Sequence, residues 1–421
     1  MTIKNESTWD VDMAMPRFSS LARSIVADVV IVGGGITGVS CAYLLSKAGK
    51  KVVLLEESLL GSGATGVTTA FLTQYLDTSL SKLVQMYGKK KTAMIAESHQ
   101  FAINEINRIV KTHDFDCEFV RCPNYIYATS RRFAEGLKKE GKIAKSLGIS
   151  LGYKEGRALK FRNYGYLELI KQGKFHPMKY LSALARTASN QGTFIFEGTS
   201  VEDIEGNSPF VVKTKKGEIM ARDVIVATYS PFNRKPYFKK VLYKSYVLEV
   251  EIPLDCFKEG IYEDTQSPYH YFRVDKGLRK DRMIIGGEDH RSDIRVHSSK
   301  SFEALKDYLE GILQRVDYKI VRRWKGPIIE PVDGLAYIGK SGDGKYYATG
   351  FSGNGMTYSI IAAHIITNKI LKKKEIFPSV YDVSRLPSLN SLIGKGVDYS
   401  KELIGGAVKN TLVYRKGKRK E

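Results

Sequence analysis

Two short uninterrupted apolar runs, residues 29–32 and 52–55, lie near the start of the chain and flank an Ala- and Leu-containing segment. Continuous runs of Val, Ile and Leu are typical of strands that helices cover on both faces. The runs therefore predict a βαβ unit in a buried parallel sheet. Farther along, apolar residues recur at helical spacing. The helices predicted in this way cover residues 79–112, 132–147, 176–192 and 301–315.

Apolar and polar residues alternate in three stretches of the second half, residues 245–254, 268–275 and 282–290. Alternation with a period of two predicts strands of an antiparallel sheet. A Gly-rich turn followed by a long apolar helix begins near residue 350. The expected fold class is therefore α/β, or α+β overall, with a Rossmann-type nucleotide-binding domain and a second domain built on a mixed or antiparallel sheet.

The glycines after the first apolar run, Gly33, Gly35 and Gly38, occupy the three fixed positions of GxGxxG. In that motif the first glycine makes a tight turn, the second lets the backbone approach a pyrophosphate, and the third lets the helix pack on the strand. Glu56 ends the second run, 21 positions after Gly35 (56 minus 35), where a carboxylate reaches an adenosine ribose. The motif predicts a dinucleotide site and leaves NAD and FAD open. Its alternative is a tight βαβ turn that binds no nucleotide.

The composition is that of a globular protein. Apolar residues make up 43% of the 421 positions, and no apolar run reaches the roughly 18 residues that a membrane span needs. The first 27 residues contain no apolar core typical of a secretory signal, so we expect a cytoplasmic protein. The four cysteines form no CxxC pair, and we expect neither a metal site nor disulfides.

The net charge of +21 at pH 7 is large, and clustered Lys and Arg attract phosphate backbones. The basic residues are nevertheless dispersed in short groups, and only residues 414–421 resemble a basic tail. We interpret the charge as solvated surface and expect no nucleic-acid partner.

Four stretches, in this order, resemble the D-amino-acid oxidase (DAO) superfamily of FAD-dependent oxidoreductases, which includes glycine oxidase and sarcosine oxidase. They are "DVVIVGGGITG…VVLLEE", "GSGATGVTTAFL", "GTSVEDI…DVIVAT" and "EPVDGLAYIG…YYATGFSGNGMT". The chain is most similar to the branch related to γ-glutamylputrescine oxidoreductase, whose members often carry a C-terminal Rieske iron-sulfur domain. The sequence to residue 421 has no Cys/His cluster of that kind, so we expect no built-in one-electron acceptor.

The resemblance implies a glutathione-reductase/DAO-like fold in which the FAD-binding domain is discontinuous along the chain. Taken with the changes in periodicity, it predicts an interleaved division of the sequence. Residues 1–27 form an N-terminal extension, 28–85, 176–235 and 326–385 the FAD-binding domain, 86–175 and 236–325 the substrate domain, and 386–421 an amphipathic C-terminal helix with a basic tail.

The resemblance also implies positions for FAD. The N-terminal glycine motif would hold the diphosphate, Glu56 the ribose, and Val201 the adenine through its backbone. The turn at 353–357 opens a helix and would lie along the flavin, where the helix dipole stabilises negative charge. The cofactor-binding residues expected are Gly33, Gly35, Ile36, Thr37, Gly38, Glu56, Ser62, Thr68, Thr69, Ala70, Val201, Thr228, Gly353, Asn354, Gly355, Met356 and Thr357. The loop near residue 68 has no His, and no Cys follows Cys256, so we expect noncovalent FAD.

The reaction that the resemblance implies is oxidation of a C–N bond in a small-molecule amine or amino acid. A hydride passes from the substrate carbon to flavin N5, and water hydrolyses the imine. This chemistry depends on position and on a neutral amine, so we assign no catalytic acid or base. Oxygen, a quinone or a separate redox protein would take the electrons. The alternatives are a tRNA-modifying flavoprotein of the same superfamily, and a flavin-binding scaffold or membrane-associated electron-transfer partner without amine turnover.

Substrate-binding candidates lie in the alternating strands. Tyr269, Tyr271 and Arg273 share one face of a predicted strand, and a guanidinium binds both oxygens of a carboxylate. Arg273 is therefore the expected anchor, with Tyr271 beside it. The alternative is an ordinary surface Arg paired with Asp275. Tyr246 is a further candidate for the pocket wall, although a core aromatic has the same sequence pattern.

Apolar residues within 386–421 recur at three- and four-residue steps with lysines between them. Four glycines weaken the predicted helix. It could dock on the catalytic body, bind a partner that accepts electrons, or lie on an anionic membrane. We expect docking on the body, and a peripheral membrane contact stays open.

Overall fold

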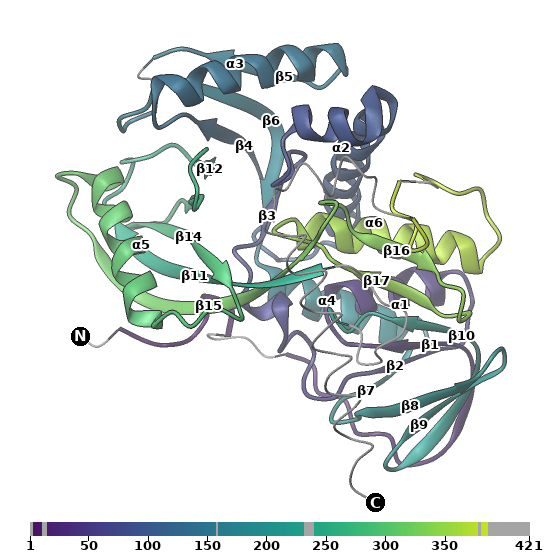
Figure 1. Ribbon diagram of the computed structural model, residues 1–421. Helices are drawn as coiled ribbons and strands as arrows, with labels where there is room; N and C mark the ends of the chain where they lie inside the picture. The colour runs from purple at the N-terminus through teal and green to yellow at the C-terminus, as the bar shows by residue number, and fades with distance from the viewer. Residues whose placement is uncertain (1–2, 11–14, 157–158, 231–239, 378–379, 386–421) are drawn as a thin grey trace, which may run out of the picture.

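The computed structural model describes residues 3–10, 15–156, 159–230, 240–377 and 380–385. Two large sheets dominate the fold, and helices α1, α2, α4 and α6 cluster near the centre of the molecule (Figure 1). The amphipathic helix and basic tail predicted over 386–421 lie outside the described residues. Within the described part, no helix combines the length and the apolar character needed to cross a bilayer.

The first sheet has eight strands and is built around β1 (Ile25–Val32). β1 pairs in parallel with β2 (Val52–Leu55) on one side and with β10 (Gly217–Val226) on the other. The two apolar runs of the sequence therefore form adjacent parallel strands, as predicted. The other strands are β7 (Phe194–Phe196), β8 (Val201–Gly206), β9 (Phe210–Thr214), β16 (Tyr337–Lys340) and β17 (Tyr346–Thr349).

Alternate residues of β1 face different layers. Val29 and Ile31 belong to a core formed with α1 (Ile36–Lys47), α4 (Pro177–Asn190) and α6 (Gly355–Ile370). Val30 and Val32 instead pack with apolar residues of β8, β9 and β10. The expectation of helices on both faces is therefore wrong for this sheet, because a β-hairpin covers the second face. The run is still uninterrupted, since a layer of strands excludes water as a layer of helices does.

The second sheet has nine strands in the order β15-β11-β14-β13-β12-β4-β6-β3, with β5 paired to β6. All neighbours are antiparallel except β12 and β4, which run parallel, so the sheet is mixed, as predicted. Helix α5 (Ser298–Leu313) covers one face through Leu305 and Leu309. The strands are β3 (Phe71–Leu72), β4 (Val120–Tyr127), β5 (Leu151–Lys154), β6 (Tyr166–Lys174), β11 (Lys240–Ile252), β12 (Gly260–Glu263), β13 (Tyr271–Asp275), β14 (Asp281–Arg291) and β15 (Lys319–Pro331).

The helices predicted from the apolar spacing are present, with ends shifted by one to three residues. Helix α2 (Leu80–His113) is one long helix with a kink at Gly88, where φ is 76° and ψ is 164°. Glycine tolerates that positive φ without a Cβ clash. Helix α3 (Arg131–Ser146) follows β4, and the short 3-10 helices are η1 (Thr8–Asp10) and η2 (Ala64–Val67).

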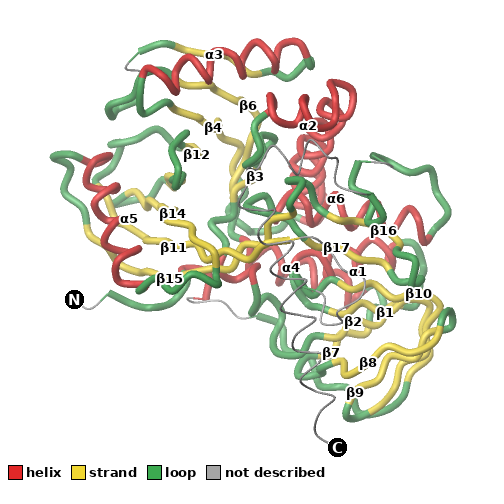
Figure 2. Tube along the Cα trace, in the orientation of Figure 1, coloured by secondary structure: helices red, strands yellow, loops and turns green. Residues whose placement is uncertain are grey.

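The domain ranges remain a prediction, and three elements cross them. Strand β3 comes from the first predicted FAD-binding segment but belongs to the second sheet, as the tube in Figure 2 also shows. Strand β15 runs through the predicted boundary at 326, and helix α2 runs through the boundary at 86. The predicted ranges therefore do not coincide with the two sheets, and residues of both sheets line the cavity described next.

Candidate active site

The turn between β1 and α1 accommodates only glycine at two of the motif positions. Gly33 has a φ of 111°, and a Cβ there would lie 2.6 Å from the carbonyl oxygen of Ala227. A Cβ at Gly38 would lie 1.9 Å from the carbonyl oxygen of Gly33. The first and third glycines therefore have the roles predicted for them: a tight turn and close packing of helix on strand.

The N-terminus of α1 has no side-chain cap at Gly35, and no acidic residue lies in its first turn. The Ile36 amide donates to Thr65 Oγ1 at 3.1 Å, while the other unpaired amides of the first turn and the positive end of the helix dipole favour an anion. Glu56 lies beside this turn. Its Oε2 accepts from the Gly34 amide at 2.7 Å and its Oε1 from the Ser58 amide at 2.9 Å. The carboxylate is thus fixed at the end of β2, where the sequence predicted a ribose contact.

A second glycine turn lies at the start of α6. Asn354 is its N-cap and makes no side-chain hydrogen bond to the helix. The Asn354 side chain instead donates to Thr73 Oγ1 at 3.2 Å, and the Gly353 amide donates to Asp77 Oδ2 at 2.8 Å. These bonds attach the segment after β3 to the start of α6. A carboxylate at a helix N-terminus is also favourable electrostatically.

Both helix starts line one cavity of about 580 Å³, a volume within the usual range for small-molecule and cofactor sites. The part of the cavity near the start of α1 is lined by Glu56, by the loop before η2 and by the residues around Val201. The second sheet contributes side chains of β11, β12 and β13 to the same cavity. From these strands it contributes Ser245, Val247, Glu263 and Tyr271, with Tyr269 just before β13, and Phe71 of β3 and residues 326–328 of β15 also line the cavity.

Most of the residues predicted for the cofactor line this cavity. They are Gly33, Gly35, Ile36, Thr37, Glu56, Ser62, Thr68, Thr69, Val201, Thr228, Gly353, Asn354, Gly355 and Met356. Three predicted residues lie behind the wall. Gly38 is packed against the turn, and Ala70 is fully buried with a φ of 58°. Thr357 donates to the Asn354 carbonyl at 3.1 Å and contacts His99 Nδ1 at 2.8 Å.

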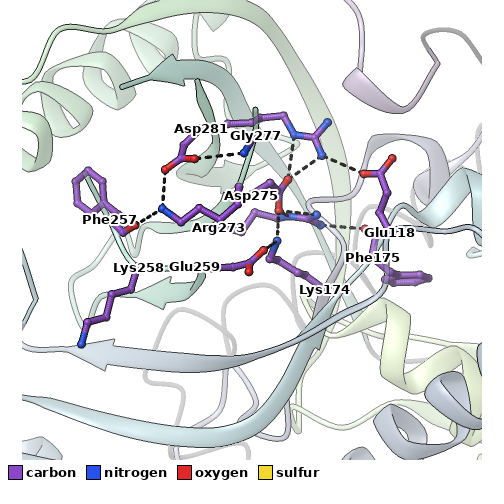
Figure 3. Close-up of polar contacts among 12 residues, drawn as sticks. Glu118, Lys174, Phe175, Phe257, Lys258, Glu259, Arg273, Asp275, Gly277 and Asp281 are labelled. Carbon is purple, nitrogen blue, oxygen red and sulfur yellow. Dashed lines mark hydrogen bonds and ion pairs between the residues drawn. The ribbon is translucent and has the colours of Figure 1, made fainter. Parts of the chain in front are cut away.

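Arg273 is not placed as a substrate anchor, and that prediction is corrected here. The side chain is 1% exposed and is absent from the cavity wall. Its Nε donates to Asp275 Oδ1 at 2.9 Å, and its Nη1 donates to the carbonyls of Thr69, Ala70 and Phe175. Figure 3 shows this polar cluster. These bonds occupy the guanidinium within the protein. Through them it holds the 68–70 loop against the sheet.

Asp275 is the centre of the cluster in Figure 3. Lys174 Nζ lies 2.6 Å from Oδ1, and Arg282 lies 2.8 Å from Oδ2. Burial by itself would raise the pKa of Asp275, but the charges of Arg273, Arg282 and Lys174 hold that pKa well below its usual range. Trp9 completes the arrangement: Arg273 lies over its ring at 5.3 Å, and its Nε1 donates to the Thr68 carbonyl. The alternative reading of Arg273, a partner of Asp275, is correct, although the pair is buried.

The predicted tyrosines separate into two groups. Tyr271 lines the cavity, and its hydroxyl lies 2.9 Å from Ser245 Oγ. Tyr246 points to the opposite face of β11, where it stacks on His290 and contacts Phe302 edge to face. Its assignment to the pocket wall is therefore corrected: Tyr246 is a core residue. The period of two explains this, because its neighbours Ser245 and Val247 are the ones that reach the cavity.

Two acidic residues that line the cavity belong to no motif that the sequence analysis could use. Asp77 lies in the segment after β3, and Glu263 is the last residue of β12. Glu263 accepts from Asn124 Nδ2 at 2.7 Å. Burial, and next the nearby Asp77 charge, raise the pKa of Glu263 to about 8. Only the pairing of distant strands brings these carboxyls together, so local motifs do not reveal them.

Comparison with known proteins agrees with this geometry. The sequence matches the family described as "DAO: FAD dependent oxidoreductase" over residues 28–369. The chain belongs to this family. It is 28% identical over 413 residues to the "Putative Rieske 2Fe-2S iron-sulfur protein YhfW" of Bacillus subtilis (strain 168), covering 95% of this chain and 80% of that protein. It is 27% identical over 390 residues to gamma-glutamylputrescine oxidoreductase of Escherichia coli (strain K12), covering 88% and 89%.

The fold is likewise that of solved family structures. Glycine oxidase from Geobacillus kaustophilus superposes with a TM-score of 0.74 at 20% identity, over 87% of this chain and 100% of that one. The described residues of this chain contain no group of His, Cys, Asp and Glu side chains that could hold a metal ion.

The chain is therefore an FAD-dependent oxidoreductase, and the residues of the cavity fit that cofactor. The uncapped start of α1 can receive a diphosphate, and Glu56 can accept from ribose hydroxyls. The uncapped start of α6 borders the part of the cavity that faces the second sheet. Both glycine turns thus line the same cavity.

Proposed function

We propose that this chain oxidises the C–N bond of an amine or amino acid. The observation that carries the proposal is that the cofactor-binding turns and the tyrosine-bearing face of the second sheet line the same cavity. A substrate held on that face would lie against the part of the cofactor site nearest α6. The names of the relatives support the reaction class, since they include gamma-glutamylputrescine oxidoreductase, 4-methylaminobutanoate oxidase and glycine oxidase.

When bound, FAD would supply a two-electron acceptor for the hydride that leaves the carbon next to nitrogen, while the nitrogen lone pair forms the C=N bond that water then hydrolyses. The chain's contribution is placement and electrostatics. Tyr271 and Ser245 form a hydroxyl pair on the substrate side. The amides at the start of α6 offer partial positive charge on the cofactor side, where negative charge accumulates on reduction.

Tyr269 and Tyr271, two of the tyrosines of the wall, keep their protons. Burial is the first cause that raises the pKa of Tyr271 and Tyr269, and nearby carboxyls raise it further. Neutral phenols can orient an amine by hydrogen bonding, but they do not remove its proton near neutral pH. The substrate is therefore expected to react as the neutral amine. We propose noncovalent FAD as well, because no Cys or His lines the described part of the cavity.

The test is anaerobic mixing of the flavin-loaded chain with a panel of amines and amino acids, followed by identification of the carbonyl product. We expect loss of the visible flavin absorbance with at least one substrate and a stoichiometric carbonyl compound. A flavin that stays oxidised with every amine would contradict the proposal and favour a scaffold or electron-transfer role. No Lys or Arg lines the described cavity wall, so this wall offers no cationic side chain for the phosphates of a nucleic-acid substrate.

A further inference from the structure

We propose that the cavity selects substrates with a second positive charge, and that Glu263, supported by Asp77 and Asp289, pairs with a distal ammonium group. The substrate class is then a diamine or a longer polyamine. This inference rests on the proposed amine oxidation and deepens it by naming what the non-reacting end of the substrate carries.

The charge of the cavity wall is opposite to that of the whole chain. The sequence contains 66 Lys and Arg residues against 45 Asp and Glu. Among the described residues, no Lys, Arg or His lines the cavity, whereas four carboxyls do. Glu56 and Glu57 lie at the nucleotide end, and Asp77 and Glu263 lie toward the second sheet. A wall of this kind attracts cations and repels carboxylates.

Glu263 lacks a cationic partner among the described residues. Its Oε1 accepts from the neutral amide of Asn124, which is fully buried. Its elevated pKa has two causes in order, loss of solvent and the charge of Asp77. An ionised carboxyl in such a place is unfavourable unless a cation pairs with it. A bound ammonium group would provide that pairing.

Asp289, on β14, extends the acidic region behind Ser245. Its Oδ1 is buried and has no hydrogen-bond partner among the described residues. Burial raises the pKa of Asp289 to about 7, against a lowering contribution from Ser245, and Asp77 raises it further. Since Ser245 also contacts Tyr271, the carboxyl is linked to the cavity wall through a hydroxyl. This buried oxygen next to a wall residue has a free acceptor site, which suits the ammonium group of a ligand or a water molecule that hydrates it.

Aromatic rings frame the same region. Tyr269 and Tyr271 have ring centroids 5.3 Å apart, and Phe71 contacts Tyr271 edge to face at 5.6 Å. The face of an aromatic ring attracts an ammonium group. Gly286 makes room for this arrangement, because a Cβ there would lie 2.5 Å from the Tyr271 ring. Carboxyls combined with aromatic rings are suited to an alkylammonium ligand.

The Arg and Lys side chains near the cavity form hydrogen bonds with other groups of the protein. Arg273 is held by Asp275 and by three backbone carbonyls. Lys240 Nζ donates to Ser230 Oγ at 2.9 Å and is not part of the lining. An amino-acid carboxylate therefore meets no guanidinium on the described wall, while a distal ammonium meets Glu263.

The test compares three substrates that share one reacting amine: putrescine, with a distal ammonium; butylamine, with a distal methyl; and γ-aminobutyrate, with a distal carboxylate. The rate of anaerobic flavin reduction at low substrate is measured above pH 8, where Glu263 is charged, for the wild type, Glu263→Gln and Asp289→Asn. Glu251→Gln is the matched control. Glu251 lies on β11 outside the cavity lining, so this variant removes the same charge from the same sheet. FAD content reports folding of each variant.

We expect putrescine to exceed butylamine by roughly 10- to 100-fold in the wild type, the effect of one charged hydrogen bond, with γ-aminobutyrate slowest. Glu263→Gln should abolish most of that advantage, Asp289→Asn should reduce it, and Glu251→Gln should leave it unchanged. Equal or faster reduction by γ-aminobutyrate, or an undiminished putrescine advantage in Glu263→Gln, would overturn the cation subsite.

Failure of the proposed reaction gives a different result. If none of the three amines reduces the flavin, amine oxidation is wrong, and the subsite is tested by thermal stabilisation of the flavin-loaded chain instead. Putrescine must then raise the unfolding temperature more than butylamine does, and Glu263→Gln must remove that difference. Absence of the difference in the wild type would overturn the subsite independently of turnover.

Discussion

Arg273 and Asp275 lie on the same face of β13, and Arg273 Nε donates to Asp275 Oδ1 at 2.9 Å. The same guanidinium holds the carbonyls of Thr69 and Ala70. One buried ion pair therefore connects the substrate-side sheet to the loop that borders the cofactor cavity. The pair determines the position of that loop and makes no contact with the cavity itself.

Replacing Arg273 by Met should destabilise the fold and release flavin. We expect a loss of about 3 kcal/mol in the free energy of unfolding, the low end for a broken buried pair, because Lys174 and Arg282 still neutralise Asp275. Denaturant unfolding and FAD content measure the two effects. Arg279→Met, at an exposed position before β14, is the control. A stable, flavin-replete Arg273→Met variant with a changed KM alone would contradict this account.

Glu56 should determine affinity for the adenosine part of FAD. Replacement by Gln retains the size of the side chain but replaces one carboxylate oxygen by an amide nitrogen. The side chain then loses its negative charge and one of the two oxygens that accept hydrogen bonds from backbone amides and would accept them from ribose hydroxyls. We expect FAD binding to weaken by about tenfold, the loss of roughly one charged hydrogen bond. Equilibrium titration of the apoprotein with FAD measures this. Glu202→Gln removes the same charge from an exposed position of β8 outside the cavity lining and should change the affinity much less.

Gly38 should tolerate no side chain. Because its Cβ would lie 1.9 Å from the Gly33 carbonyl, Gly38→Ala forces α1 away from β1. We expect a loss of about 1–3 kcal/mol, as for overpacked interiors, and purification without flavin. Nothing lies within 4 Å of a Cβ built at Gly136, which lies on α3 outside the cavity lining, so Gly136→Ala should remain stable and yellow. Equal FAD content in the two variants would show that close packing of α1 is unimportant.

Glu263 should introduce a pH dependence in the use of a diamine. Its pKa in the folded chain rises from 4.5 to about 8 through burial, with Asp77 and Asp264 raising it and Asn124 opposing them. The carboxyl is thus protonated below pH 8 and charged above it. Since the ammonium group pairs with the charged form, kcat/KM for putrescine should rise as pH increases through about 8, and Glu263→Gln should lack this rise. A profile identical in both proteins would exclude Glu263.

Glu263 should also make the stability of the fold depend on pH. Stability should fall over the pH range in which the carboxyl becomes charged, whereas kcat/KM for putrescine should rise. A carboxyl whose pKa is raised on folding binds more protons in the folded state between its two pKa values, so its contribution to stability falls as pH rises from 4.5 toward 8. We expect Glu263→Gln to be more stable than the wild type at pH 8 and nearly equal at pH 4. Thermal unfolding at the two pH values provides the measurement.

Tyr271 and Tyr246 form a natural pair of test and control, because they lie in the same sheet on opposite faces. Removing the Tyr271 hydroxyl breaks its contact with Ser245 at the cavity wall. Tyr271→Phe should lower kcat/KM by about tenfold, as expected for one lost hydrogen bond. Tyr246→Phe should leave kcat/KM unchanged, with at most a small change in stability. Equal effects would contradict the assignment of faces.

The sequence was most informative where structure is local. The glycines at 33, 35 and 38 and the distance to Glu56 fix a turn, a helix start and a carboxylate within one βαβ unit, so the local structure of this unit could be predicted from the sequence. The second turn near Gly353 was predicted equally well because it opens a helix. Ala70 and Thr357 were expected to line the cavity but lie buried behind its lining residues. A sequence motif does not distinguish a residue that lines a cavity from a neighbour that is packed behind it.

The substrate side depended on which face of each strand meets the cavity. Alternation put Tyr271 and Arg273 on one face correctly, but only the position of the 68–70 loop determines that Arg273 is covered. Tyr246 was assigned to the wrong face because the sequence does not show which of the two alternating faces of β11 meets the cavity; Ser245 and Val247 are on that face. Glu263 lies 186 positions from Asp77 (263 minus 77), and only the pairing of β12 into the sheet brings them to one cavity.

The most direct measurement is a crystal structure of the flavin-loaded chain with putrescine under anaerobic conditions. The account predicts one FAD molecule whose diphosphate meets the backbone at Ile36 and Thr37 and whose ring meets the turn at Gly353. It also predicts the distal ammonium of putrescine at Glu263. A flavin that contacts only one of the two turns, or a ligand whose charged end avoids Glu263, would contradict it.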